Sequence, residues 1–439
     1  MSFLYSLPNE LLIVIFKFCD VYTLSQISMV CKQFCRVSYM ILNEKANHLL
    51  VTNQMSEKFC ERCKLLLSSY DSKFITNYNW KHGIYEENEI CKLINTNPHF
   101  NKNLLQMTKN MICLFDKNCL LAYNRDNFKE KAVEICNSDI IAITYCNDVI
   151  LTSHRDGSIR LRRIQLQGEN TNYFTQLKIH CNVFDGIINH IDATSQHIIL
   201  SCRLSNTDAS IEIQKNMYEK DGCVERNQIF YRKKCLVSSV SFDPTGIKFA
   251  ANTSDLEHPR LTSFRIYDID KSYQVMHKEY DDTLDQLLWE DPHTILTLHM
   301  DYIKKIDMRT SKCVHMCDTS SIPEWSDILT CFSSDYLYTI MTGTRNGKII
   351  LWDQRKSAPI QTYQISPIRK SDSFFFNEIR SIQFDSTYLY AVTKDKLIEF
   401  DFKGSYFEDY FEDYSIKRLK HKKIKNFFVN FLNNIFQKN

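Results

Sequence analysis

The sequence predicts a mainly β protein with a small α-helical domain at its N-terminus, in which seven sheets close into a seven-bladed β-propeller. Two observations predict this fold. Apolar residues at helical spacing fill the first forty-odd residues, and this periodicity has stopped by about residue 109. Beyond it, an apolar residue followed by Asp closes successive strands at about 39, 46 and 48 residues' separation, ending at Asp268, Asp307, Asp353 and Asp401. That spacing is near the period of a propeller blade, which a two-sheet sandwich would not explain.

Residues 1–45 are expected to form three short amphipathic helices. Pro8 suits the first helical position, where a missing N–H costs nothing. Asp20 is placed to cap the second helix. The apolar faces of the three helices carry Leu11, Leu12, Ile15, Phe16, Cys19, Leu24, Ile27, Val30, Phe34 and Val37. So small a helical domain is marginal alone, and we expect it to keep an apolar stripe for a partner.

Residues 46–108 are assigned to a linker. Cys60 and Cys63 form a CxxC pair, but a zinc site needs two further ligands, and His82 and Cys91 do not repeat the spacing of a zinc finger. No metal site is therefore predicted. The aromatic segment from Trp80 to Tyr85 is expected to anchor the linker to the following domain.

Residues 109–404 are assigned to the propeller. Residues 327–353 give the clearest unit, which reads strand, turn, strand, Asn346-Gly347 turn, strand. Asn-Gly is a strong hairpin signal because both residues tolerate positive φ. The other six units are Met111–Val133, Ile140–Ile164, Ile187–Ile213, Val237–Tyr267, Leu284–Ile306 and Ile379–Phe400.

Composition limits the classes of function. Lys and Arg number 54 against 52 Asp and Glu, which argues against a protein that seeks nucleic acid or membrane surfaces overall. No apolar run is long enough to span a bilayer. The 17 cysteines are scattered, and no basic n-region precedes the first helix. This predicts a reducing compartment, the cytoplasm or nucleus. No phosphate loop, metalloprotease motif or nucleophile elbow occurs, so neither catalysis nor a cofactor is predicted.

Residues 405–439 form a separate charged and amphipathic tail. A basic run covers residues 417–425, and an apolar stripe at helical spacing follows at Phe428, Phe431, Leu432, Ile435 and Phe436. Four interpretations stay open: a terminal helix docked on the propeller, a nuclear-import patch, a segment that binds anionic lipid, and disorder.

Two stretches of the N-terminal domain resemble an F-box. They read Leu7-Pro8-x-Glu10-Leu11-Leu12-x-x-Ile15-Phe16 and Leu24-x-x-Ile27-Ser28-x-Val30-Cys31-Lys32-x-Phe34. With the repeats that follow, the chain resembles the F-box/WD-repeat family, although it has a single Trp-Asp pair, Trp352-Asp353, and no Gly-His dipeptide. The resemblance implies a WD-type propeller and a non-catalytic substrate-recognition subunit of an SCF-type ubiquitin ligase. Its F-box would bind a Skp-type adaptor and, through it, a cullin–RING ligase.

The resemblance implies two binding surfaces. The residues expected to contact the adaptor are Leu7, Pro8, Leu11, Leu12, Ile15, Phe16, Leu24, Ile27 and Val30, with Leu12 and Phe16 best placed for internal packing instead. On the propeller, a basic residue precedes the turn Asp or Asn in four units, at Arg125, Arg155, Arg345 and Lys394. Equivalent positions converge on one rim of a ring, so these side chains would suit an acidic or phosphorylated protein substrate. Solvated turn charges are the alternative interpretation.

Two other functions fit the same sequence. A WD-repeat scaffold could assemble other complexes, with the N-terminal helices serving only as a cap. A propeller enzyme is a third possibility, which a bound metal or a pH-dependent activity would support. Co-purification with a Skp-type adaptor separates the first function from the second.

Overall fold

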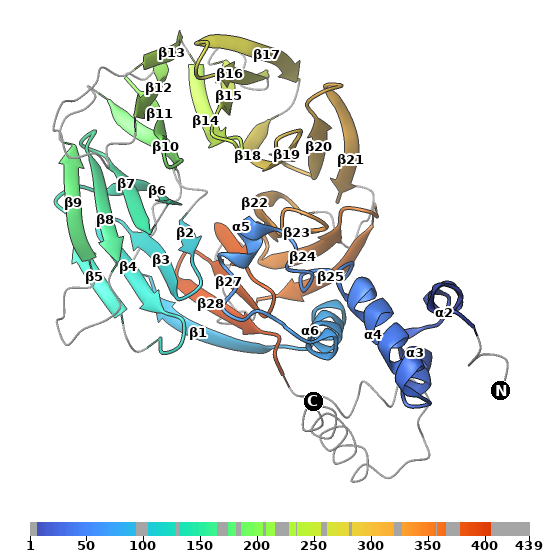
Figure 1. Ribbon diagram of the computed structural model, residues 1–439. Coiled ribbons are helices and arrows are strands. Elements are labelled where there is room, and N and C mark those ends of the chain that lie inside the picture. Colours follow the sequence, from blue (N-terminus) through green and yellow to red (C-terminus); the bar gives the residue numbers. More distant parts are fainter. Residues whose placement is uncertain are drawn as a thin grey trace.

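The structure is a computed structural model. It describes residues 7–93, 104–128, 131–146, 148–164, 174–180, 186–204, 208–215, 228–233, 235–255, 261–280, 283–319, 327–356, 358–365 and 378–404. The tail predicted at 405–439 lies outside the described residues. A ring of sheets makes up most of the molecule, and a helical module lies at one side of it (Figure 1).

The helical module begins with three helices, α2 (Asn9–Lys17), α3 (Val21–Ser28) and α4 (Lys32–Ala46). The carboxylate of Asp20 accepts a hydrogen bond from Thr23 N at 2.7 Å, so the predicted cap of α3 is present. Pro8 lies one residue earlier than predicted, at the N-cap of α2. The three helices enclose a small core of Leu12, Phe16, Leu24, Phe34, Val37, Ile41 and Leu42.

Two further helices follow, α5 (Glu57–Cys60) and α6 (Tyr70–His82). Gly83 ends α6 in the left-handed region at φ 66°, which favours glycine and turns the chain into the ring. The ring starts directly afterwards, with β1 (Glu86–Lys92). These two helices, β1 and the next strand, β2 (Leu105–Met107), therefore lie inside residues 46–108, which the sequence pattern assigned to the linker.

The ring consists of seven four-stranded antiparallel sheets, as predicted. We number them as blades 1 to 7 along the chain and give each from its inner to its outer strand. Blade 1 consists of β2 (Leu105–Met107), β3 (Met111–Asp116), β4 (Cys119–Asn124) and β5 (Lys131–Ile135), and blade 2 of β6 (Ile140–Cys146), β7 (Val149–His154), β8 (Ile159–Ile164) and β9 (Phe174–His180). Blade 3 consists of β10 (Ile187–Ala193), β11 (His197–Arg203), β12 (Ala209–Lys215) and β13 (Gln228–Lys233), and blade 4 of β14 (Cys235–Phe242), β15 (Lys248–Asp255), β16 (Thr262–Asp268) and β17 (Tyr273–Tyr280). Blade 5 consists of β18 (Leu284–Asp291), β19 (Thr294–His299), β20 (Tyr302–Asp307) and β21 (Lys312–Asp318), and blade 6 of β22 (Leu329–Ser334), β23 (Thr339–Thr344), β24 (Lys348–Asp353) and β25 (Pro359–Gln364). Blade 7 consists of β26 (Ser381–Phe384), β27 (Tyr388–Val392), β28 (Lys396–Asp401) and β1.

The two ends of the ring meet in blade 7. Inner strands of successive blades pack against one another all round, and β26 packs against β2. The outer strand of blade 7 comes from the other end of the ring, because β1 pairs antiparallel with β28 from Glu86↔Asp401 to Lys92↔Lys396. This closure leaves no open blade between the first and the last sheet.

Alternating strand directions give the ring two different faces. Turns between first and second strands, and between third and fourth strands, lie on one face. Turns between second and third strands lie on the other face, together with the connections between blades. The chain enters β1 and leaves β28 on the first face, so the helical module lies on that side. We call the first face, on the side of the helical module, the linker face. We call the opposite face, which carries the turns between second and third strands, the hairpin face.

Candidate functional site

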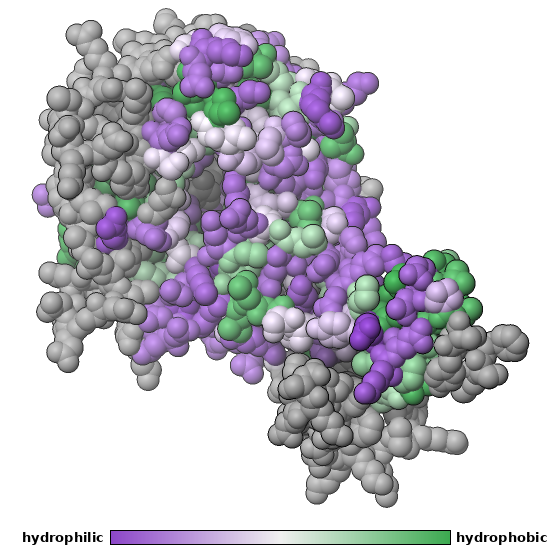
Figure 2. Space-filling model, in the orientation of Figure 1, coloured by the Kyte–Doolittle hydropathy of each residue, from purple (hydrophilic) through white to green (hydrophobic). Residues whose placement is uncertain are grey.

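The first candidate surface is a stripe of exposed apolar side chains on α2. Leu11, Val14, Ile15 and Phe18 are all exposed, and Phe18 is 89% exposed. Their spacing of three and four residues places them on one side of the helix. Hydrophobic residues gather at this end of the molecule in Figure 2. We call these four residues the α2 stripe.

The predicted adaptor residues divide between this surface and the core. Leu12, Phe16 and Leu24 are buried, and Phe16 packs edge-on against Phe34 at 5.3 Å between ring centroids. Leu12 and Phe16 were the two residues best placed for internal packing, whereas Leu24 was expected to contact the adaptor and instead belongs to the helical core. Of the remaining six residues, Leu7 and Ile27 are half-buried, and Pro8, Leu11, Ile15 and Val30 are exposed.

Sequence reasoning missed Val14 and Phe18, although both follow Leu11 at helical spacing. The pattern favoured the face that carries Leu12 and Phe16, which is the face that packs on α4 through Phe34.

Trp80 anchors the helical module to the ring, as the aromatic segment predicted. The indole is buried, stacks on Phe402 at 3.6 Å between ring centroids, and donates from Nε1 to the backbone oxygen of Ser386 at 3.0 Å. On the other side of the module, Arg355 Nη1 donates to the backbone oxygen of His48 at 3.0 Å. The helices are thus attached to both blade 6 and blade 7.

The linker between α4 and α6 lies across the linker face and binds the turns of blades 6 and 7. Asn53 Nδ2 donates to Asp335 at 2.9 Å, and Lys64 N donates to Asp385 at 2.9 Å. The buried guanidinium of Arg62 donates to the backbone oxygen of Ser334 and to Gln383 Oε1. These contacts cover the turns of two neighbouring blades on this face.

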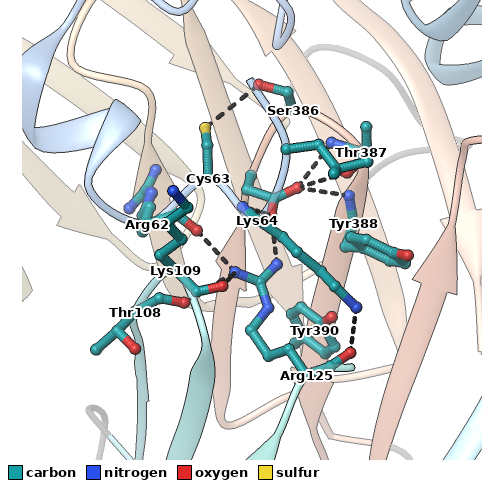
Figure 3. Close-up of polar contacts among 12 residues, drawn as sticks. Arg62, Cys63, Lys64, Thr108, Lys109, Arg125, Ser386, Thr387, Tyr388 and Tyr390 are labelled. Carbon is teal, nitrogen blue, oxygen red and sulfur yellow. Dashed lines mark hydrogen bonds and ion pairs between the residues drawn. The ribbon is translucent and has the colours of Figure 1, made fainter. Parts of the chain in front are cut away.

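Arg125 is not part of an exposed basic rim. Its side chain is 0% exposed and pairs with the equally buried Asp385, while Nη1 donates to the backbone oxygens of Arg62, Thr108 and Lys109 (Figure 3). Although burial opposes its charge, Asp385 raises the pKa of the guanidinium. Arg125 therefore joins blade 1, blade 7 and the linker, a structural role that the sequence pattern did not predict.

The position of Arg125 in blade 1 also differs from the predicted one. It follows β4, the third strand, and its N–H donates to Asn110 on the linker face. The hairpin between the second and third strands turns instead at Lys117-Asn118, between the paired residues Asp116 and Cys119. Sequence reasoning chose Arg125-Asp126 because it fits the pattern of a basic residue followed by Asp or Asn. The turn in the structure lacks glycine and places Lys117 itself at φ 54°.

The other three basic residues lie on the hairpin face, in turns of the predicted kind. Arg155 follows β7, Arg345 follows β23 and Lys394 follows β27. Lys117 occupies the same position in blade 1 and is exposed. Basic residues therefore occupy this turn in four consecutive blades, 6, 7, 1 and 2, and we call Lys117, Arg155, Arg345 and Lys394 the basic arc.

The turn carboxylates beside the arc are engaged locally. Asp156 accepts from Ser158 N and Oγ at 3.0 and 2.6 Å, and Asp395 accepts from Thr393 Oγ1 at 2.8 Å. Arg155 pairs with Asp139 at 3.6 Å while its side chain stays 63% exposed. In blades 3 and 5, the described parts of the corresponding connections carry Asp208 and Asp301, and in blade 4 Asp255 is the last residue of the strand before the connection. The basic residues of the arc are thus accompanied by carboxylates on the same side of the hairpin face, namely Asp139, Asp156 and Asp395.

Cys60 and Cys63 lie in the linker as free thiols. Burial raises the pKa of the Cys63 thiol to about 11, which disfavours the thiolate needed to bind metal or attack a substrate. Within the described residues, no group of three or more His, Cys, Asp or Glu side chains is arranged to hold a metal ion. Among the described helices, none has the length and apolar character to cross a membrane.

Comparisons with known proteins agree with this architecture. The F-box-like family model matches residues 4–42. F-box/WD repeat-containing protein 4 of Mus musculus is 22% identical over 91% of this chain and 94% of its own length. The Homo sapiens protein of the same name is 21% identical over 91% of this chain and 93% of its own. A chain in the crystal structure of the mitotic checkpoint complex has a TM-score of 0.52 at 10% identity, covering 72% of this chain and 90% of that one, which supports the fold alone.

Proposed function

We propose that this chain, which has the organisation of the F-box/WD-repeat family, is the substrate-recognition subunit of an SCF-type ubiquitin ligase. The observation that carries the proposal is the α2 stripe, an exposed apolar surface on an F-box-like module that is fixed to a propeller. In this role the chain positions a substrate, and other subunits supply the ubiquitin-transfer chemistry. The cytoplasm or nucleus is the proposed compartment.

The α2 stripe is the proposed contact for a Skp-type adaptor. Four adjacent apolar side chains that are exposed in the free chain gain the most from burial in a partner. Truncating one at the centre of such a contact costs about 2 kcal/mol or more of binding free energy. Because Leu11 and Ile15 are 48% and 42% exposed, changing them should leave the helical core in place.

The test is a pull-down of the full chain, probed for a Skp-type adaptor and a cullin. We expect the wild type to retain both and the Leu11→Asp, Ile15→Asp variant to lose both. The matched control is Val133→Asp, Ile135→Asp on β5, where two side chains are similarly exposed but distant from α2. If wild type and both variants all fail to bind the adaptor while remaining folded, the scaffold function takes precedence.

The basic arc is the proposed contact for a protein substrate that presents an acidic or phosphorylated segment. Arginine binds carboxylates and phosphates through paired, charge-assisted hydrogen bonds. Four consecutive blades place their basic turns on one side of the hairpin face, which favours a segment that runs along the rim. Arg125 has no part in this proposal, and Lys117 takes its place.

Charge reversal tests the arc. Arg155→Glu, Arg345→Glu should abolish binding of an acidic substrate while adaptor binding persists. Lys271→Glu, Arg309→Glu is the matched control, since those side chains are 68% and 70% exposed in turns of the linker face. Both variants change the net charge equally, so a general charge effect would weaken binding in both. Unchanged substrate binding in the Arg155, Arg345 variant would end the proposal for the arc.

A further inference from the structure

Exposed large apolar side chains are concentrated on the helical module. Of the 21 such side chains among the described residues, nine lie within residues 7–46, namely Leu11, Val14, Ile15, Phe18, Tyr22, Met29, Val30, Tyr39 and Met40. A soluble protein rarely leaves a concentration of this kind uncovered. When no other protein is bound, a segment of the same chain is one source of cover.

The described chain ends beside this module. Asn79 of α6 donates from Nδ2 to the backbone oxygens of Phe402 and Gly404, at 2.8 and 3.2 Å. Helix α6 packs in turn on α4, where the rings of Tyr70 and Tyr39 lie 5.6 Å apart. The chain therefore leaves blade 7 on the linker face, next to the helix that joins the ring to the F-box.

The remaining 35 residues carry an amphipathic pattern. In a helix, Phe428, Phe431, Leu432, Ile435 and Phe436 would share one side. The opposite side would carry Asn426, Asn430, Asn433 and Gln437. An extended connection of 24 residues from Gly404 to Phe428 spans up to about 80 Å, so the apolar side can reach α2.

The parts of the ring nearest Gly404 give this segment no comparable place to bind. β1, which pairs with β28 beside the chain exit, carries Glu86, Glu87 and Glu89. The exposed apolar side chains of the propeller are distributed over several blades, as at Ile135, Ile247, Val275 and Val314. Among the described surfaces, the α2 stripe combines apolar side chains at helical spacing with a place in the helical module, which contacts the chain exit through Asn79 of α6.

We propose that residues 426–437 dock as an amphipathic helix on the α2 stripe and cover it when no adaptor is bound. A short flexible tether gives the segment an effective concentration in the millimolar range. A contact with an intrinsic dissociation constant of about 0.1 mM would then be closed about nine-tenths of the time, and would weaken adaptor binding about tenfold. This competition rests on the proposed function, whereas the docking itself does not.

The experiment compares the full chain with two variants that add equal charge. Phe431→Asp, Ile435→Asp disrupts the apolar side, and Asn430→Asp, Gln437→Glu alters the polar side. Amide hydrogen exchange of peptides from α2 is measured without adaptor at two protein concentrations. A Skp-type adaptor is then titrated into each protein.

We expect exchange in α2 to be slower in the full chain and in the polar-side variant than in the apolar-side variant, at both concentrations. The apolar-side variant should bind the adaptor about tenfold more tightly. Equal exchange in all three proteins would overturn the docking, and so would protection that moves to the propeller strands or that rises with protein concentration, which indicates a second copy. If α2 is protected but no protein binds the adaptor, the docking stands and the proposed function fails.

Discussion

The guanidinium of Arg125 lies between the first and the last blade, where Asp385 and three backbone oxygens receive its hydrogen bonds. Asp385 in turn accepts from the N–H groups of Thr387 and Tyr388, which fixes the first turn of blade 7. One ion pair thus joins residues 260 positions apart in the chain. The pairing depends on ring closure, so no local sequence signal could have predicted it.

Removing Arg125 should destabilise the propeller strongly. Arg125→Met leaves Asp385 as a buried charge without its counter-ion, and we expect a loss of about 3–5 kcal/mol in the free energy of unfolding. Adding Asp385→Asn removes that charge but keeps the oxygen that accepts from the turn, and should restore part of the loss. Urea unfolding of both variants checks this. A double variant that is less stable than Arg125→Met would contradict it.

His154 should make stability depend on pH. The ring is buried, with Nε2 2.9 Å from Thr152 Oγ1, and burial lowers the pKa of His154 to about 4. An unfolded histidine titrates near 6.5, so between the two values the unfolded chain binds the proton and the folded chain does not. Stability therefore falls as the pH drops below about 6.5, by about 2 kcal/mol between pH 7 and pH 5 from this residue.

Urea unfolding at pH 7 and pH 5 measures that difference. His154→Gln keeps polar atoms at the site and removes the titration, so it should lose about 2 kcal/mol less than the wild type between the two pH values. An identical pH dependence in both proteins would show that His154 is not responsible.

At the scale of elements, α2 has a buried side that packs in the helical core and an exposed side that is the proposed contact for the adaptor. Phe16 is buried against Phe34, and Phe18 is exposed two residues later. Phe16→Ala should cost about 3–5 kcal/mol of stability, whereas Phe18→Ala should change it by less than about 0.5 kcal/mol. Thermal unfolding of the Phe16→Ala and Phe18→Ala variants measures their stability, and adaptor titration measures their binding. Equal stability loss in both variants would mean that Phe18 is also packed in the folded chain.

The strands differ in how well the sequence predicts them. Units such as 327–353 were predictable because Asn346-Gly347 fixes the hairpin, and Gly347 does adopt φ 79°. Blade 1 was less predictable because its turn, Lys117-Asn118, has no glycine. β1 escaped prediction because it is polar, with Glu86, Glu87 and Glu89, and because its partner β28 lies about 300 residues away in the chain.

At the scale of the whole molecule, the sequence predicts the parts better than their attachment. The helical periodicity and the repeat period identify the module and the blades. Which face the linker covers, and which side of the ring carries the basic arc, depend on strand direction and on the closure of blade 7. Both are set by contacts between distant residues, such as Trp80 with Ser386 and Asn53 with Asp335.

Closure by β1 makes the helical module part of the ring, and this can be tested in the full chain. A site for a sequence-specific protease, inserted within residues 94–103, allows the backbone to be cut after folding. We expect the two pieces to stay together on gel filtration, because β1 pairs with β28 over six residue pairs and Trp80 stacks on Phe402. Unfolding of the cut protein should then depend on its concentration, since the pieces separate on unfolding.

A matched variant identifies what holds the pieces together. Trp80→Ala removes the stack on Phe402 and the hydrogen bond to Ser386, and a buried tryptophan is worth about 3–5 kcal/mol. The cut Trp80→Ala protein should therefore dissociate at protein concentrations where the cut parent stays whole, while the uncut variant remains folded. If the cut parent itself separates at once, β1 does not close the ring, and the helical module would be tethered to the propeller rather than fixed against it.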